Sequence, residues 1–301
     1  MARVANTGVS STGYPLVICF NRREMKMNDQ PILVIGSTGK TGSRVAAKLE
    51  SKGSQVRHGS RRSKTPFDWE EQATWRPILS GVSKAYVTYF PDLAFPGAVE
   101  KLAEFAEVGA QTGLQHIVLL SGRGEHFAGM GEEVIRNSGL GFTIVRAAWF
   151  AQNFSEGYLR DPILDGVLPM PGGDIAEPII DIDDIADVVV AALSEEGHLG
   201  KRYEVTGPRL MTFAEMAAVL STALGRRIRH VPITFEEFHA NVAGSGGRFV
   251  ADVFTAIARE TLDGRNAQTT DGVMRAIGRA PRDFTEFAKT AAAAGKWTKA
   301  A

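Results

Sequence analysis

Three glycines, Gly36, Gly39 and Gly42, constrain the fold of this chain more than any other feature of its sequence. They follow an apolar run over residues 32–35 that is typical of a strand buried on both faces of a parallel sheet. They precede a segment, residues 41–51, whose apolar residues recur at the spacing of an amphipathic helix. Strand, glycine turn and helix in this order predict a dinucleotide-binding α/β unit.

Each glycine of this turn has its own role in such a unit. Gly36 permits the tight turn, Gly39 lets the backbone approach a pyrophosphate, and Gly42 allows the helix to pack closely on the sheet. The free amides of the first helical turn then face the phosphate oxygens. The alternative is a glycine turn that only saves space. The residues predicted to bind the pyrophosphate are Gly36, Ser37, Thr38, Gly39, Lys40, Thr41 and Gly42.

A P-loop is the competing interpretation of these glycines. That motif needs four residues between its glycines and then Gly-Lys-Ser/Thr, whereas only two residues separate Gly36 from Gly39. Nucleoside triphosphate hydrolysis is therefore disfavoured.

A basic loop follows the second predicted strand, residues 55–58, and indicates which dinucleotide binds. An NAD site places an acidic residue about 20 positions after the glycines, but no acid occurs from Gln55 to Pro66. Ser60, Arg61 and Arg62 stand at that distance and are suited to bind a 2'-phosphate. A solvated basic loop is the alternative. We predict that the cofactor is NADPH.

Further strands and helices alternate along the chain. Strands are expected over residues 83–91, 115–122 and 141–150, with helices over about 97–111 and 132–137. This alternation predicts a doubly wound parallel sheet. Later segments predict a helix that starts at 181–184, a strand at 201–208, a helix capped by Thr212 and Glu215, and glycine-broken helices after Phe235.

Composition limits the classes of function. The chain has 301 residues, 44% of them hydrophobic, and its 34 basic residues balance its 34 acidic ones. A net charge of zero gives no overall attraction to nucleic acid or to a membrane surface. One cysteine, Cys19, forms no disulfide within the chain and no metal cluster, so no metal site and a cytoplasmic location are expected. The apolar run 14–20 is too short to span a bilayer.

Several longer motifs carry a family resemblance. "FDW" (67–69), "HIVLLSG" (116–122), "VRAAWFAQNF" (145–154) and "DIDDIADVVVAAL" (181–193) occur in this order. With the glycine turn, they resemble the NmrA-like, atypical branch of the short-chain dehydrogenase/reductases, and within it bacterial relatives of the agroclavine dehydrogenase and festuclavine synthase group.

The resemblance covers residues 31–297 and implies a domain division. It implies a Rossmann-like NADP-binding domain over 29–155 and a smaller, mainly helical substrate lobe over 156–301, with parts of 178–206 returning to the sheet. Residues 1–28 are expected to be a disordered tail or an over-long start. The expected partner is a small-molecule substrate, and the expected assembly is a monomer or homodimer.

The resemblance also implies roles for individual residues. Asp68 would lie near the adenine at the end of a third strand, and Thr88 to Pro91 would border the cofactor at the end of the fourth. Ser121, at the end of the fifth strand, would be the catalytic serine facing the nicotinamide ribose. Past the sixth strand, three aromatic side chains either shape a flat substrate pocket or pack in the core, and one amide either touches substrate or caps a turn. The residues predicted for that pocket are Trp149, Phe150, Asn153 and Phe154.

The proton-donor pair of the superfamily, Tyr-x-x-x-Lys, is absent after Ser121. The stretch that should carry it, residues 124–139, reads "GEHFAGMGEEVIRNSG"; its His126 is either a general acid or idle. Quinones, imines or iminium ions, and enones accept hydride without that pair, since water can supply the proton. An NADPH-dependent reductase of such substrates is therefore expected. A non-catalytic NADP(H) sensor is the alternative, and a sugar-nucleotide epimerase or dehydratase ranks last.

Overall fold

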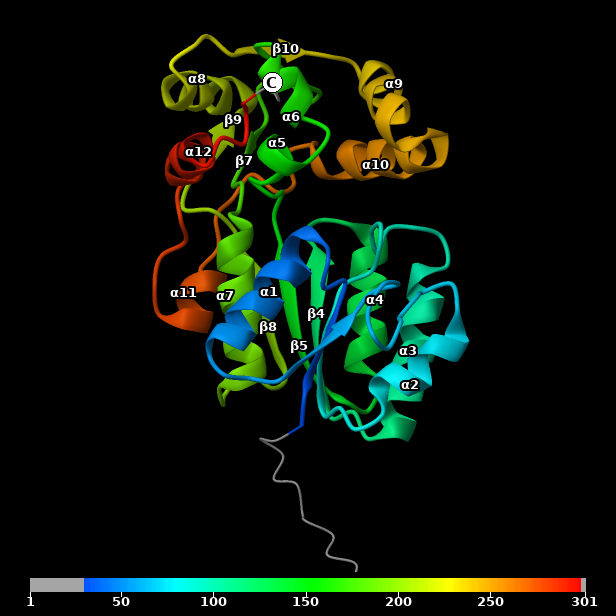
Figure 1. The fold of residues 1–301 in the computed structure, drawn as a ribbon. Helices are drawn as coiled ribbons and strands as arrows, with labels where there is room; N and C mark the ends of the chain where they lie inside the picture. Colours follow the sequence, from blue (N-terminus) through cyan, green and yellow to red (C-terminus); the bar gives the residue numbers. More distant parts are fainter. Residues whose placement is uncertain (1–29, 299–301) are drawn as a thin grey trace, which may run out of the picture.

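The computed structural model describes residues 30–298. The tail predicted over residues 1–28 and Cys19 lie outside them. A six-stranded parallel sheet forms the centre of the larger domain, in the order β2-β1-β3-β4-β5-β8 (Figure 1). The chain therefore has the predicted doubly wound fold. The strands are β1 (Ile32–Ile35), β2 (Val56–Gly59), β3 (Lys84–Val87), β4 (His116–Gly122), β5 (Gly141–Ala147) and β8 (Lys201–Val205).

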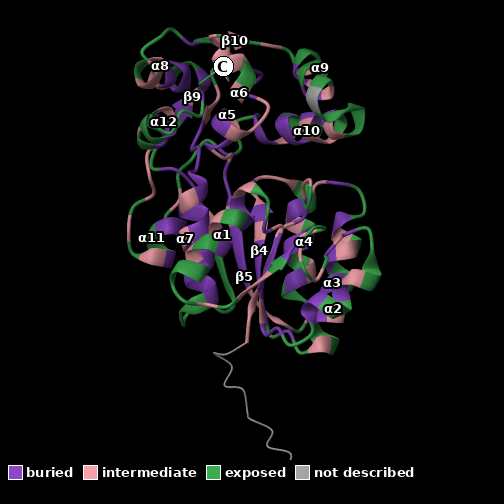
Figure 2. Cartoon of the chain, in the orientation of Figure 1, coloured by how far each residue is buried: buried purple, intermediate pink, exposed green. Residues whose placement is uncertain are grey.

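Helices cover both faces of this sheet. Side chains alternate between the faces, so Leu33 and Ile35 of β1 pack on one side and Val34 on the other. The inner strands β1, β3, β4 and β5 are mostly buried, whereas the edge strands β2 and β8 are partly exposed. Most other exposed residues lie on the outer sides of the helices and in loops (Figure 2). One face is covered by α2 (Trp75–Leu79), α3 (Ala98–Thr112) and α4 (His126–Arg136), and the other by α1 (Lys40–Ser51), α7 (Ile182–Ser194) and α11 (Gly272–Ile277).

A smaller lobe lies over the carboxyl ends of the strands (Figure 1). It has its own hydrophobic core, which includes Phe154, Phe213, Phe238 and Phe284. Its helices are α5 (Asn153–Glu156), α6 (Arg160–Leu164), α8 (Phe213–Leu224), α9 (Phe235–Gly246), α10 (Arg248–Thr261) and α12 (Phe284–Ala293). Its strands form two pairs: β6 (Val167–Met170) with β10 (Arg229–Pro232), and β7 (Ala176–Glu177) with β9 (Met211–Thr212).

Some boundaries differ from the sequence prediction. The strand expected over 83–91 ends at Val87, where its pairing with β4 ends, and the strand expected over 141–150 ends at Ala147. The third strand expected before Asp68 is wrong: a 3₁₀ turn, η2 (Gln72–Thr74), is the only regular element between β2 and α2. Local hydrogen bonds hold that segment, including one from the Trp75 indole Nε1 to the Asp68 carbonyl at 2.8 Å. The helix expected at 132–137 begins earlier, with His126 as its first residue.

Two findings concern membranes and metals. Within residues 30–298, no helix is both long enough and apolar enough to cross a bilayer. In the same part of the chain, no three His, Cys, Asp or Glu side chains are grouped closely enough to hold a metal ion.

Candidate functional site

The glycine turn forms a close-fitting cradle at the carboxyl end of β1. Gly36 has φ +68°, a conformation that favours glycine, and its N–H donates to the Gly59 carbonyl at 2.8 Å. A Cβ on Gly42 would lie 2.2 Å from the Gly36 carbonyl oxygen, so only glycine fits there. A Cβ on Gly36 would lie 2.6 Å from the Thr88 side chain. The turn thus packs against both β2 and the end of β3.

The polar groups of this cradle fit a phosphate. α1 begins after Gly39 with no side-chain cap and no acidic residue in its first turn. The Ser37 hydroxyl is buried and has no hydrogen-bond partner in the part of the chain that the structure describes. Thr38 is exposed at the rim. The Thr41 hydroxyl accepts a hydrogen bond from the Tyr86 hydroxyl at 2.8 Å. A bound anion would satisfy the free amides of the helix and the buried serine.

The basic loop lies directly beside this cradle, because the carbonyl of Gly59, at the end of β2, accepts a hydrogen bond from Gly36 of the glycine turn. The Ser60 and Ser63 hydroxyls hydrogen-bond each other at 2.8 Å and shape the loop. Arg61 and Arg62 are exposed, and neither forms an ion pair with any residue from 30 to 298. Their charge is therefore available to an anionic ligand.

Lys40 connects the glycine turn to the lobe. Its ammonium donates to the Asn153 side-chain oxygen at 2.8 Å, and Arg44 pairs with Glu156 at 2.8 Å. Burial lowers the pKa of Lys40, and the nearby Glu156 carboxylate opposes that effect. The residue predicted to contact phosphate and the amide predicted near substrate are thus held together, with Asn153 as the first residue of α5.

The other predicted cofactor contacts lie at the same edge of the sheet or next to it. Thr88 follows β3, and its carbonyl accepts from the Trp69 indole at 3.3 Å. Pro91 follows in the same loop, after a cis peptide bond. The Asp68 carboxylate accepts from the Glu70 N–H at 3.1 Å. Their contacts with the cofactor stay predictions.

Ser121 belongs to a buried polar network. Only 3% of it is exposed, and its hydroxyl donates to Glu132 of α4 at 2.7 Å. Glu132 in turn binds Arg146 of β5 through two hydrogen bonds, at 2.8 and 2.6 Å. The Ser121 hydroxyl therefore already has a partner within the protein. Its predicted catalytic role stays a prediction.

The three predicted pocket aromatics lie in different environments. Phe154 is 1% exposed and stacks edge-on against Phe284 inside the lobe core, so the core-packing alternative describes it. Phe150 packs on the sheet face covered by α1 and α7. Trp149 is half-buried against the lobe core, and its indole donates to Thr261 of α10 at 3.1 Å. Of the three, Trp149 is the one that lies where the sheet meets the lobe.

Sequence reasoning missed two buried charged residues at this edge. Arg123, directly after β4, is 4% exposed, and Glu177, on β7, is 1% exposed. One nitrogen of Arg123 and both carboxylate oxygens of Glu177 have no partner among the described residues. Nothing in the local sequence marks either residue, because their positions depend on contacts between distant segments.

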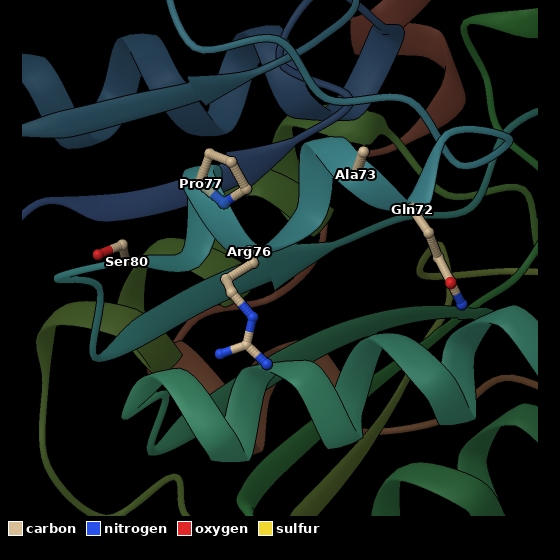
Figure 3. Close-up of a pocket in the computed structure, with 5 residues that line it drawn as sticks. All are labelled: Gln72, Ala73, Arg76, Pro77 and Ser80. Carbon is tan, nitrogen blue, oxygen red and sulfur yellow. The ribbon is translucent and has the colours of Figure 1, made fainter.

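An open surface hollow lies elsewhere, along η2 and α2. Figure 3 shows its lining residues, and Gln72 and Arg76 point toward α3, where they bond Glu104 and Gln111. The residues that line it are Gln72, Ala73, Arg76, Pro77 and Ser80. None of them belongs to the glycine turn or to the basic loop, so this hollow is separate from the predicted site.

Known proteins resemble this chain along nearly its whole length, although no protein-family model matches it. It is 31% identical to the uncharacterized oxidoreductase YesF of Bacillus subtilis, with 90% of this chain and 98% of that protein covered. It is also 31% identical to the NAD(P)H azoreductase of Xenophilus azovorans, with 87% and 98% covered. Festuclavine dehydrogenase easG of Aspergillus fumigatus is 27% identical, with 86% and 96% covered.

Solved structures share the fold. The Escherichia coli NADPH-dependent quinone oxidoreductase QOR2 complexed with NADPH has a TM-score of 0.74 at 20% identity, covering 86% of this chain and 99% of that one. A mutant form of NmrA has a TM-score of 0.64 at 17% identity, covering 87% and 95%. At these sequence identities, the structural similarity establishes the fold alone.

Proposed function

This chain belongs to the NmrA-like, atypical branch of the short-chain dehydrogenase/reductases, and from that premise we propose that it is an NADPH-dependent reductase of small electron-poor substrates. The observation that carries the proposal is the close-fitting cradle at Gly36–Gly42, which lies beside two arginines without acidic partners among the described residues. The relatives named as NAD(P)H azoreductase and festuclavine dehydrogenase support a reductive activity.

The residues of the chain have defined tasks in this reaction. NADPH, when bound, supplies a hydride to an electrophilic carbon. The glycine turn and α1 hold the pyrophosphate, and Ser60, Arg61 and Arg62 bind the 2'-phosphate. The lobe covers the carboxyl ends of the strands, where it shields the substrate from water and orients it.

The acceptor is a quinone, an imine or iminium ion, or an enone. The chain has no Tyr-x-x-x-Lys pair after Ser121, so it lacks the usual proton donor for reducing a simple ketone. Conjugated or cationic acceptors place less demand on that donor, because hydride addition to them produces a stabilised product. Positioning then supplies much of the rate.

Cofactor preference is tested by titrating NADPH and NADH onto the purified protein. We expect NADPH to bind more tightly, and the double variant Arg61→Ala, Arg62→Ala to lose roughly tenfold or more in NADPH affinity while its NADH affinity stays nearly constant. Arg76→Ala is the matched control, since Arg76 is an exposed arginine that bonds Gln111 away from the cradle. Tighter binding of NADH by the unmodified protein would contradict the proposal.

Turnover separates the reductase from the sensor. NADPH oxidation is followed with a panel of quinones, imines and enones, and with an azo dye because of the relative named azoreductase. We expect at least one acceptor to accelerate NADPH oxidation above the background decay of the cofactor. If NADPH binds tightly and no acceptor is reduced, the NADP(H)-sensing function, as in a regulator of the NmrA type, becomes the better description.

A further inference from the structure

Arg123 and Glu177 are buried residues of opposite charge that influence each other electrostatically, although no ion pair joins them. Arg123 uses two of its nitrogens: Nε donates to Glu204 at 2.7 Å, and Nη1 donates to the Asn266 carbonyl at 2.6 Å. Its third nitrogen, Nη2, and both oxygens of Glu177 are buried without a hydrogen-bond partner among the described residues. Buried polar atoms are rarely left in this state, so a group outside the protein chain is expected to satisfy them.

Backbone hydrogen bonds place both side chains where β5 leaves the sheet. The Arg123 N–H donates to the Ala147 carbonyl at 3.0 Å, only two residues after Ser121. The segment that carries Glu177 runs along the continuation of β5, where the Ile180 N–H donates to the Trp149 carbonyl at 2.9 Å. This is the carboxyl edge of β4 and β5, the side on which a nicotinamide is expected in this fold. Both residues therefore lie at the edge of the sheet where the acceptor is predicted.

We propose that Arg123 and Glu177 are catalytic residues that bind the heteroatom of the acceptor and complete its reduction. This inference rests on the proposed reductase function and deepens it. Arg123 Nη2 donates a hydrogen bond to the oxygen or nitrogen on which negative charge develops. Glu177 then gives its proton to that atom, taking the part that the missing tyrosine has elsewhere in the superfamily.

The step balances in atoms and electrons. For a neutral acceptor, that is a quinone, an imine or an enone, the hydride leaves NADPH with its electron pair and forms a C–H bond at the acceptor carbon. This reduces the acceptor to an anion and oxidises NADPH to NADP⁺. The O–H bond of Glu177 breaks as an O–H or N–H bond forms on the acceptor. The resulting carboxylate recovers its proton from water before the next turnover.

The surroundings of Glu177 suit a proton donor near neutral pH. Burial raises the pKa of Glu177 to about 7, with Arg123 lowering the pKa and Asp263 raising it further. A general acid works best when its pKa lies close to the working pH. Since only the protonated form is active, kcat/KM is expected to fall as the pH rises through about 7.

The first experiment compares the pH profile of kcat/KM for NADPH oxidation in the unmodified protein and in Glu177→Gln. The acceptor is a quinone or an enone. We expect the variant to lose about 100-fold in kcat/KM and to lose the decline above neutral pH, because no proton donor remains. NADPH affinity should stay unchanged, since Glu177 is placed against the acceptor. An unchanged rate and pH profile would overturn the inference and indicate that a buried water bridges the pair.

The second experiment uses exposed residues, whose substitution leaves the packing of the core intact. Asp263→Asn removes a negative charge that raises the pKa of Glu177, so the decline in kcat/KM should move to lower pH with little change in the maximal rate. Asp271→Asn is the matched control: it makes the same charge change at an exposed residue that pairs with Arg275, and it should leave the profile in place. Equal profiles for all three proteins would count against Glu177 as the donor.

The two proposals fail in different ways. If the unmodified protein reduces no acceptor, the reductase function and this inference are both overturned. If it turns over and Glu177→Gln binds NADPH and turns over equally well, only the inference is overturned.

Discussion

Individual glycines of the phosphate-binding turn are required for different physical reasons. Gly36 needs a positive φ, which side chains disfavour, whereas Gly42 has ordinary helical geometry and needs space. The atom that a Cβ on Gly42 would meet is a backbone carbonyl oxygen, which cannot rotate away as a side chain does. A substitution at Gly42 is therefore a direct test of whether this turn forms the binding cradle.

Gly42→Ala should disrupt the cradle. We expect the backbone of the turn to shift, which lowers the free energy of unfolding by roughly 1–3 kcal/mol and weakens NADPH binding. Gly129→Ala is the control, because Gly129 lies within α4 and a Cβ there meets nothing within 4 Å; it should raise stability by up to about 1 kcal/mol. Urea unfolding and NADPH titration measure both effects. Unchanged NADPH affinity in Gly42→Ala would show that the cradle is not the binding site.

The N-terminus of α1 differs from those of four capped helices of this fold. α7, α8, α9 and α12 each begin with an Asp or Thr side chain that accepts a backbone N–H of the first turn. α1 has no such cap, and an acidic side chain there would repel a phosphate. Other helices, such as α3 and α4, also begin without a side-chain cap, so the absence of a cap does not by itself mark a ligand site. The end of α1 is set apart by its place directly after the glycine turn, which leaves its free amides open to a phosphate.

The capping box of α8 is expected to act on stability alone, because it lies outside the predicted cofactor site. Thr212 accepts the Glu215 N–H, and the Glu215 carboxylate accepts the Thr212 N–H, as the Thr-x-x-Glu pattern predicts. Thr212→Ala should lower the free energy of unfolding by about 1 kcal/mol without affecting NADPH affinity. Thr222→Ala is a matched control in the same helix, where the exposed hydroxyl bonds only the Ala218 carbonyl, and a smaller effect is expected. Equal losses in urea unfolding would argue against the cap.

At the scale of the whole molecule, the C-terminal segment fastens the lobe to the sheet domain. It leaves the lobe after α10, packs α11 against α7, and returns to the lobe as α12 (Figure 1). Asp184 of α7 is fully buried and binds the Arg282 N–H at 2.7 Å, the Arg282 guanidinium, and Arg279 at 2.6 Å. Lys40 and Asn153 join the same two bodies beside the cradle. The lobe is thus held over the cofactor edge by charged contacts between distant segments.

Asp184→Asn should loosen this attachment. Removing the Asp184 charge leaves its two arginines without their buried partner, and we expect the free energy of unfolding to fall by roughly 2–4 kcal/mol. The loss is smaller than for a fully buried ion pair because both arginines are partly exposed to solvent. Asp187→Asn is the control: its side chain is 25% exposed and pairs with the same arginines and with Lys48 of α1, so a smaller loss of roughly 1 kcal/mol is expected. Urea unfolding measures both, and equal losses would show that the burial of Asp184 gives it no special weight in the attachment.

The sequence by itself determined the features that depend on neighbouring residues. The glycine turn, the alternating strands and helices, the caps of α7 and α8 and the break between α9 and α10 each arise from residues a few positions apart, so periodicity and turn chemistry predict them. The same holds for the basic loop, whose place beside the cradle follows from the parallel pairing of β1 with β2.

Only the tertiary structure decided what depends on contacts between distant segments. Local pattern did not reveal that the chain before Asp68 forms no strand, that Ser121 bonds Glu132, or that Phe154 lies in the lobe core. Arg123 meets the Asn266 carbonyl across 143 positions, and Lys40 meets Asn153 across 113. Burial and electrostatic partners are set by such long-range packing. Two ordinary charged residues, Arg123 and Glu177, therefore gain a candidate chemical role only once the lobe is placed on the sheet.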